Sequence, residues 1–145
     1  MKARVRSKFG RGFVLLEEHL LKIDDIITKR VASGDKVKVT YNVHRADDAL
    51  ITYDIAKDVI TEDNSNIDRI KEIKIEAKDD HTIAEILFSS TDNTIMSIEC
   101  DERDRALLLS SDLKSYLNSE ICIQKLYWVS SIIKSRIFLP LFMMF

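Results

Sequence analysis

The sequence predicts a single α+β domain, in which a mostly antiparallel sheet carries two long helices on one of its faces. Three observations support this fold class. Apolar residues recur at three- and four-residue steps in two segments, and they alternate with polar residues in five segments between these two. Three of the four connections between the alternating segments are short and use Asp and Asn, which favour tight turns. A chain of 145 residues is also long enough to bury one core.

Residues 1–12 form a basic segment that precedes the domain. This segment carries five Lys or Arg residues and no acid. Its first four basic residues alternate with small or apolar residues, so an extended backbone places the charges on one side. We expect a mobile or edge-strand terminus, and the functional alternative is contact with anionic lipid headgroups, each basic residue adding about 1 kcal/mol. The four residues concerned are Lys2, Arg4, Arg6 and Lys8.

The domain itself begins with a predicted helix over residues 13–31. Its apolar stripe consists of Leu16, Leu20, Ile23, Ile27 and Val31. The pair Gly34-Asp35 is typical of a helix end. From residue 36 the period changes to two, and residues 37–43 and 49–55 predict a hairpin with its turn at residues 46–48.

A three-stranded meander is predicted after a short helix over residues 56–62 and a loop over residues 62–66. Its strands are residues 71–77, 82–89 and 94–100. Alternation gives them one buried face, made of Ile73, Ile75, Ala77, Ala84, Ile86, Phe88, Met96, Ile98 and Cys100. The opposite face has mixed charge and faces solvent, as is common in antiparallel sheets; it carries Glu72, Lys74, Glu76, Glu85, Ser97 and Glu99.

The second long helix is predicted to start at Asp101, which has the character of an N-cap. It runs to about Leu117, and Asn118 and Ser119 break its pattern. The domain therefore covers residues 13–119, and residues 120–145 form an amphipathic to apolar C-terminal segment. Within that segment residues 121–136 fit either a strand or a helix, and we favour the helix.

The last nine residues of the chain have no polar side chain. Basic and aromatic residues precede them, as at a membrane–water boundary, but a spanning helix needs about 20 apolar residues. Three interpretations stay open: the first turns of a transmembrane helix from a longer protein, a short membrane-contacting tail, or a segment buried in the core or in an oligomer interface. The expected membrane or partner contacts are Trp128, Lys134, Arg136, Ile137, Phe138, Leu139, Leu141 and Phe142.

The sequence carries few motifs with chemical meaning. Gly10 and Gly12 do not complete a dinucleotide-binding fingerprint, and no spacing of His and Cys matches a metal site, so we expect neither cofactor nor metal. Two local clusters are interpreted structurally: Glu17-Glu18-His19 as a solvated helix face and Asp79-Asp80-His81 as a tight turn. Cys100 ends a strand before a helix, and alternation makes it a packed thiol rather than a reactive one.

Charge and cysteine content indicate the compartment. The formal net charge is −2, and residues 45–105 carry 17 acids against 8 bases, so we expect no nucleic-acid partner. Two cysteines and an opening segment without a signal-peptide pattern favour a reduced, cytoplasmic setting. If the apolar tail contacts a membrane, the basic flank before it predicts that the domain lies on the cytoplasmic, inner face of that membrane.

Three functional hypotheses follow. The first is a non-catalytic cytoplasmic sensory, regulatory or assembly domain, associated with a membrane through its C-terminal segment and serving an unidentified protein partner. The alternative is a soluble protein that self-associates through an apolar interface made of Leu126, Trp128, Ile132, Ile133 and the tail. The third is an enzyme whose site is assembled from distant residues, with His44 or His81 among acids.

Overall fold

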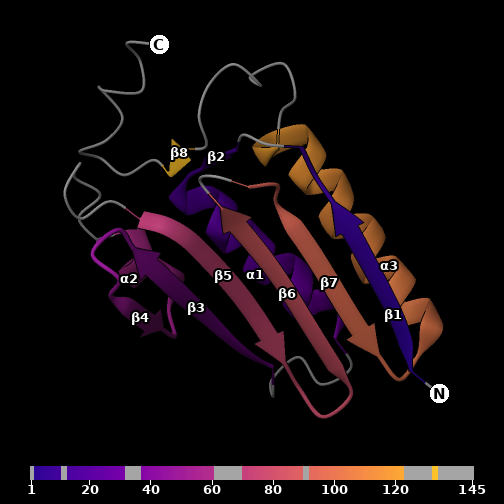
Figure 1. Cartoon of the computed structure of the whole chain (residues 1–145). Helices are drawn as coiled ribbons and strands as arrows, with labels where there is room; N and C mark the ends of the chain where they lie inside the picture. Colours follow the sequence, from indigo (N-terminus) through magenta and orange to yellow (C-terminus); the bar gives the residue numbers. More distant parts are fainter. Residues whose placement is uncertain are drawn as a thin grey trace.

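The computed structural model describes residues 2–10, 13–31, 37–60, 70–89, 92–122 and 132–133. Its main feature is a six-stranded sheet in the order β1-β7-β6-β5-β3-β4, in which every neighbouring pair is antiparallel (Figure 1). The strands are β1 (Ala3–Lys8), β3 (Lys38–Arg45), β4 (Leu50–Tyr53), β5 (Ile70–Lys78), β6 (Thr82–Ser89) and β7 (Ile95–Cys100). The predicted α+β class, hairpin and meander are confirmed.

The basic N-terminal segment takes the edge-strand alternative. Strand β1 pairs with β7, with Ala3 opposite Cys100 and Lys8 opposite Ile95. The first strand of the chain therefore lies beside the last strand of the meander, and it extends the sheet by one strand beyond the predicted hairpin and meander.

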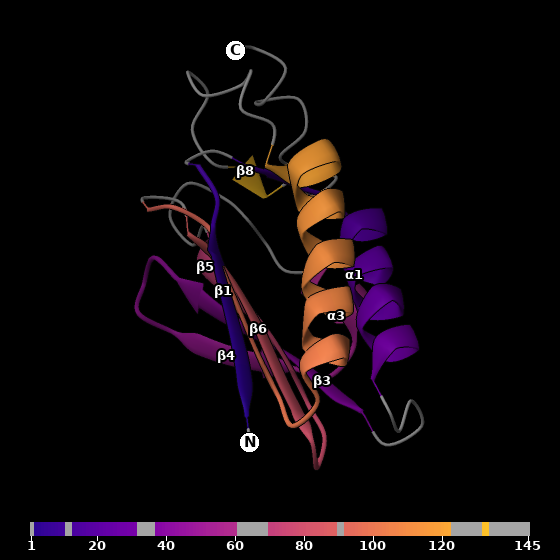
Figure 2. The ribbon, with the colours of Figure 1, turned by 90° about the vertical axis from the view of Figure 1, so that its right-hand side faces the viewer.

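Both long helices cover the same face of the sheet, as predicted (Figure 2). These helices are α1 (Glu17–Arg30) and α3 (Arg103–Tyr116), and a short helix α2 (Ala56–Ile60) follows the hairpin. The two long helices contact each other, and an ion pair between Arg30 and Asp112 joins their surfaces. The helix stripes and the predicted inner face of the meander are buried together in one core, which includes Leu20, Ile27, Ile75, Phe88, Leu109 and Leu113.

The first helix begins at Glu17 and not at residue 13 as predicted. Phe13 and Leu15 are buried in the core, and Val14–Leu15 forms a short strand, β2, parallel to β8 (Ile132–Ile133). His19 explains the start of the helix, because its Nδ1 accepts a hydrogen bond of 2.9 Å from the Leu16 backbone N–H. Burial of Phe13 and Leu15 in an extended backbone thus replaces the first helical turn.

The boundaries of the second long helix also differ from the prediction. Asp101 is not its N-cap, because the Asp101 N–H donates to the His81 carbonyl at 3.1 Å and so continues the strand pairing; Glu102 takes the N-cap position. Asn118 and Ser119 do not end the helical backbone, which continues as a π-helical turn, η2 (Leu117–Ile121). Burial of Leu117 and Ile121 accounts for this continuation.

Of the ambiguous residues 121–136, only positions 121, 122, 132 and 133 are described. The backbone at Ile132–Ile133 is a strand rather than the favoured helix. Among the described residues, no helix has both the length and the apolar character needed to cross a bilayer.

Two neighbouring acids on α1 have opposite environments. Asp24 is half-buried beside Tyr41, whose hydroxyl lies 3.3 Å from its carboxylate; burial raises the pKa of Asp24, and the Tyr41 hydrogen bond offsets part of that rise. Asp25 is partly exposed, and its hydrogen bond with Lys29 lowers its pKa. Ionisation therefore disfavours the folded state at Asp24 and favours it at Asp25.

These signs predict opposite pH dependences for two adjacent substitutions. Because the folded-state pKa of Asp24 is raised, its contribution to stability is present below its unfolded pKa and is lost as the pH rises through the folded pKa. The unfolding free energy of Asp24→Asn, measured by urea titration and compared with that of the unsubstituted chain at each pH, should therefore increase as the pH rises from about 4 to about 7. Asp25→Asn is the matched control: because the folded-state pKa of Asp25 is lowered, its contribution to stability is present above its unfolded pKa and is lost as the pH falls through the folded pKa. The unfolding free energy of this variant should therefore fall relative to the unsubstituted chain as the pH rises through the region below about pH 4, with little change above it; equal trends for both variants would contradict the assignment.

Candidate functional site: the open face of the sheet

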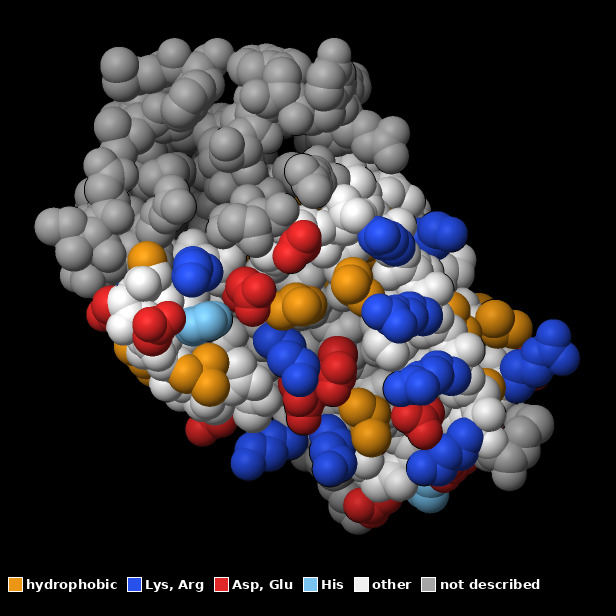
Figure 3. Space-filling view, in the orientation of Figure 1, with side chains coloured by type: hydrophobic (Ala, Val, Ile, Leu, Met, Phe, Trp, Pro, Cys, Tyr) orange, Lys and Arg blue, Asp and Glu red, His pale blue; other side chains and the backbone are white. Residues whose placement is uncertain are grey.

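One face of the sheet is not covered by any described element. The helices α1 and α3 lie on the opposite face (Figure 2), and Figure 3 views the open face directly. Its side chains are the outward positions of the strands, where Lys and Arg, Asp and Glu, and a few apolar side chains are interspersed (Figure 3). This confirms the predicted mixed-charge face and adds the apolar residues Ile83, Leu87 and Ile95, which were not singled out in the sequence.

Three of the predicted lipid-contacting residues, Arg4, Arg6 and Lys8, lie on β1 at the edge of this face, and Lys2 directly precedes the strand. Exposure alternates along β1, so Arg4, Arg6 and Lys8 are exposed while Ala3, Val5 and Ser7 are half-buried on the helix side. Lys2 pairs with Glu99 at 3.5 Å. Within the described residues, the side chains of Arg4, Arg6 and Lys8 have no ion-pair or hydrogen-bond partner. We call these three side chains the basic row.

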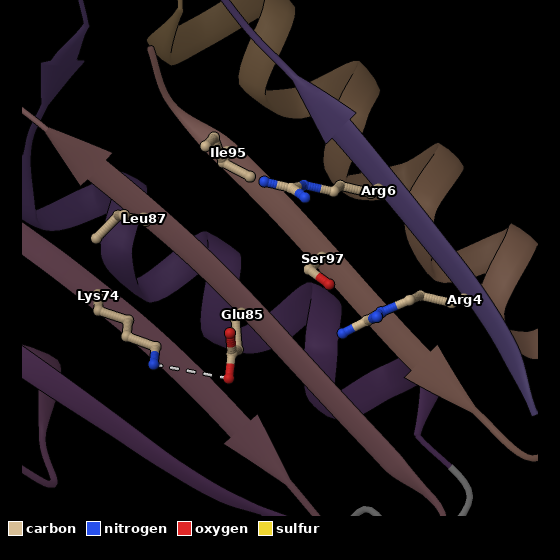
Figure 4. A pocket seen from close by; sticks show the side chains of 7 residues that line it. All are labelled: Arg4, Arg6, Lys74, Glu85, Leu87, Ile95 and Ser97. Carbon is tan, nitrogen blue, oxygen red and sulfur yellow. Dashed lines mark ion pairs between the residues drawn. The ribbon is translucent and has the colours of Figure 1, made fainter. Parts of the chain in front are cut away.

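A shallow open groove of about 370 Å³ lies beside the basic row. Leu87 and Ile95 are cross-strand partners and supply its apolar part, while Arg4 and Arg6 extend from β1 toward Ser97 and Ile95 (Figure 4). On the other side Lys74 and Glu85 form an ion pair of 3.7 Å. The charges of Lys74 and Glu85 thus offset each other, and the two arginines keep their capacity to bind carboxylates bidentately.

His19, in the first turn of α1, is buried and has a structural function, whereas the sequence predicted a solvated position for it. His19 is only 6% exposed, its Nδ1 caps the helix start, and its ring contacts Tyr116 edge-on at a centroid distance of 6.2 Å. Its neighbours Glu17 and Glu18 are exposed, so the three side chains point apart. No group of three metal-ligating side chains comes together in the described part of the chain.

The second polar cluster forms the turn between β5 and β6, as predicted. One carboxylate oxygen of Asp79 accepts the backbone N–H groups of His81 and Thr82, at 2.8 and 2.6 Å. The His81 ring lies 3.1 Å from the Asp101 carboxylate at an exposed position. His44 lies on the open face, 3.9 Å from Glu72 and 4.0 Å from Asp48. Neither of these two histidines lines the groove.

Both cysteines are packed in the core. Cys100 is 1% exposed, and its sulfur lies 3.3 Å from the Thr82 hydroxyl and 3.4 Å from the Glu102 N–H. Cys122 is buried at the end of the π-helical turn, and burial raises its pKa to about 11. The prediction that Cys100 is a buried thiol is confirmed.

The predicted contacts at the C-terminus lie outside the described residues. These are Trp128, Lys134, Arg136, Ile137, Phe138, Leu139, Leu141 and Phe142. The structure brings the basic row together with residues of β5, β6 and β7 that sequence reasoning did not link to it. The available signal was the outward positions of residues 83–87 and 95–99, where apolar side chains interrupt an otherwise polar face.

Comparisons with known proteins give no further assignment. No family model, no curated protein and no solved structure matches this chain.

Burial of both thiols predicts slow modification of the folded protein. At pH 8 a thiol reagent should label neither Cys100 nor Cys122 until denaturant unfolds the chain, because burial excludes the reagent and the raised pKa of Cys122 keeps that thiol protonated. Labelling is followed by mass spectrometry. The control Ser111→Cys, at an exposed position of α3, should react within the mixing time. Fast labelling of either native thiol would contradict the packing.

Proposed function

We propose that the chain is a non-catalytic cytoplasmic regulatory or assembly domain that associates with a membrane through its C-terminal segment. The observation that carries the binding function is the basic row, which has no charge partner among the described residues and lies at the edge of a sheet face that no described element covers. Exposed bases that pair with nothing in their own domain are available to an external ligand.

Three candidate groups for catalysis have structural functions, and the two histidines of the enzyme hypothesis, His44 and His81, do not line the groove. His19 caps a helix and packs against Tyr116, Asp79 holds a turn, and Cys100 is buried against Thr82. These uses favour a binding domain over the enzyme that was the third hypothesis from the sequence.

The C-terminal sequence supports the membrane association. The strand β8 pairs Ile132 and Ile133 with Val14 and Leu15, and residues 134–145 follow it directly in the sequence. That continuation combines the bases Lys134 and Arg136 with nine apolar residues. A single weak membrane-binding feature gives only reversible membrane binding, whereas an apolar segment together with basic residues gives stable attachment to the membrane.

Liposome flotation tests this proposal. The intact chain should float with vesicles containing anionic lipid and should stay bound after a high-salt wash, because screening removes charge contacts but not apolar insertion. A chain with Phe138→Glu and Phe142→Glu, and a chain ending at Ser135, should both remain at the bottom of the gradient.

The matched control removes charge elsewhere. Arg4→Gln with Arg6→Gln should float as the intact chain does. Equal flotation of intact and tail-substituted chains would overturn the membrane association. Absence of flotation, with a monodisperse oligomer in sedimentation, would instead favour the self-associating protein, in which residues 126–145 form the interface.

A further inference from the structure

Among the described residues no strand pairs with the outer edge of β1, and the register of β1 determines which residues direct their backbone groups to that edge. The Phe9 N–H donates to the Thr94 carbonyl at 2.8 Å, directly after the pair of Lys8 and Ile95. In an antiparallel pair, residues alternately direct both backbone groups toward the partner and away from it. Ala3, Val5 and Ser7 therefore bond to β7. Arg4, Arg6 and Lys8 direct their N–H and C=O groups outward.

The residues with outward backbone groups are thus the same residues that form the basic row. No described element lies beyond β1, which is drawn in front of the sheet in Figure 2. A strand that adds to this edge would hydrogen-bond to Arg4, Arg6 and Lys8. Its residues directly opposite these three would then place their side chains on the open face, within reach of the row.

This register disfavours pairing of β1 with a second copy of itself. In an antiparallel ladder the outward-bonding residues of one strand stand opposite the outward-bonding residues of the other. Two copies of β1 would therefore align the basic rows, with Arg6 opposite Arg6 or opposite another base. Like charges directly opposite are destabilising, so the edge is protected against self-pairing.

An added strand that carries acids would place opposite charges, rather than like charges, directly across from the basic row. Alternate residues of an extended chain lie about 7 Å apart on one face, so acids at alternate positions match Arg4, Arg6 and Lys8 one to one. The side chains between these acids in the added strand would point to the other face of the sheet, toward α3. There Leu107 is 46% exposed and available for an apolar contact. Leu107 lies about 140° around α3 from Asp112, which faces α1, so it is on the flank toward the sheet edge.

We propose that β1 is a docking edge for an extended segment of a partner protein that carries acids at alternate positions, added antiparallel to β1 as a seventh strand. This inference names the partner of the binding domain proposed above and rests on that proposal. A protein segment is favoured over a lipid surface because Glu85 and Glu99 share the open face with the row, and an anionic bilayer would meet these acids as well. A bilayer would also leave the outward backbone groups unused.

The experiment measures binding of a synthetic peptide to the intact chain. The probe alternates glutamate with valine over nine residues, and its affinity is read by calorimetry while backbone amide shifts are followed by NMR. We expect binding that weakens with added salt and shifts centred on residues 4–8. A peptide of the same composition with its glutamates grouped at one end is the composition control and should bind at least tenfold more weakly.

Two further changes separate backbone pairing from charge. N-methylation of the glutamates that face Arg4 and Arg6 should abolish binding, whereas N-methylation of the intervening valines should not, because only the former lose a donor to β1. On the protein, Arg6→Glu replaces an attraction by a repulsion and should raise the Kd about tenfold or more. Lys57→Glu, at an exposed position of α2, which packs on α1, β3 and β4, changes the charge equally and should leave the Kd unchanged.

Several results would overturn the inference. These are equal binding of the grouped and alternating peptides, insensitivity to N-methylation, and shifts centred away from β1. Binding of anionic vesicles that Arg6→Glu removes, with no peptide binding, would assign the row to lipid headgroups instead. Flotation through the C-terminal tail is measured separately, so its loss would not remove peptide binding, and loss of peptide binding would not remove flotation.

Discussion

Burial of one face of the sheet under α1 and α3 is the constraint on which the other features depend. Side chains alternate along each strand, so fixing the residues that meet the helices also fixes those that face outward. Val5, Ile98 and Ile86 face the core on neighbouring strands, and their chain neighbours Arg4, Glu99 and Glu85 are therefore on the open face. A shift of one residue in any of these strands would bury charge, which makes the position of the basic row a result of core packing.

The pairing of β1 with β7 links this core to the binding surface. It is a long-range contact, with Ala3 opposite Cys100, and it also brings β1 against α3. On its helix side β1 adds half-buried Ala3 and Val5 to the core. On its other side it adds bases that have no ion-pair partner among the described residues to a face that carries ion pairs such as Lys74 with Glu85. The same six residues thus serve stability on one side and recognition on the other.

Local patterns in the sequence predicted the hairpin, the meander and the buried stripes of both long helices, because neighbours in the chain determine these features. Sequence reasoning did not give the neighbour of β1, since alternation of Arg4 and Val5 describes a strand without naming its partner. It also placed the first helix start too early, because the burial of Phe13 and Leu15 and the capping by His19 are tertiary effects. The groove was missed because Leu87 and Ile95 come together only through the register of β6 and β7.

The long-range position of β1 also has a consequence for synthesis of the chain. Strand β1 leaves the ribosome first, but its partner β7 ends at Cys100, so at 5–20 residues per second β1 waits roughly 5–20 s for it. Throughout that interval both of its edges are unpaired, and neighbouring nascent chains offer identical strands. Repulsion between the arginines and lysines of two β1 strands opposes the pairing of neighbouring nascent chains on a polysome. The same charges that disfavour self-pairing in the folded domain therefore also disfavour it before the domain has folded.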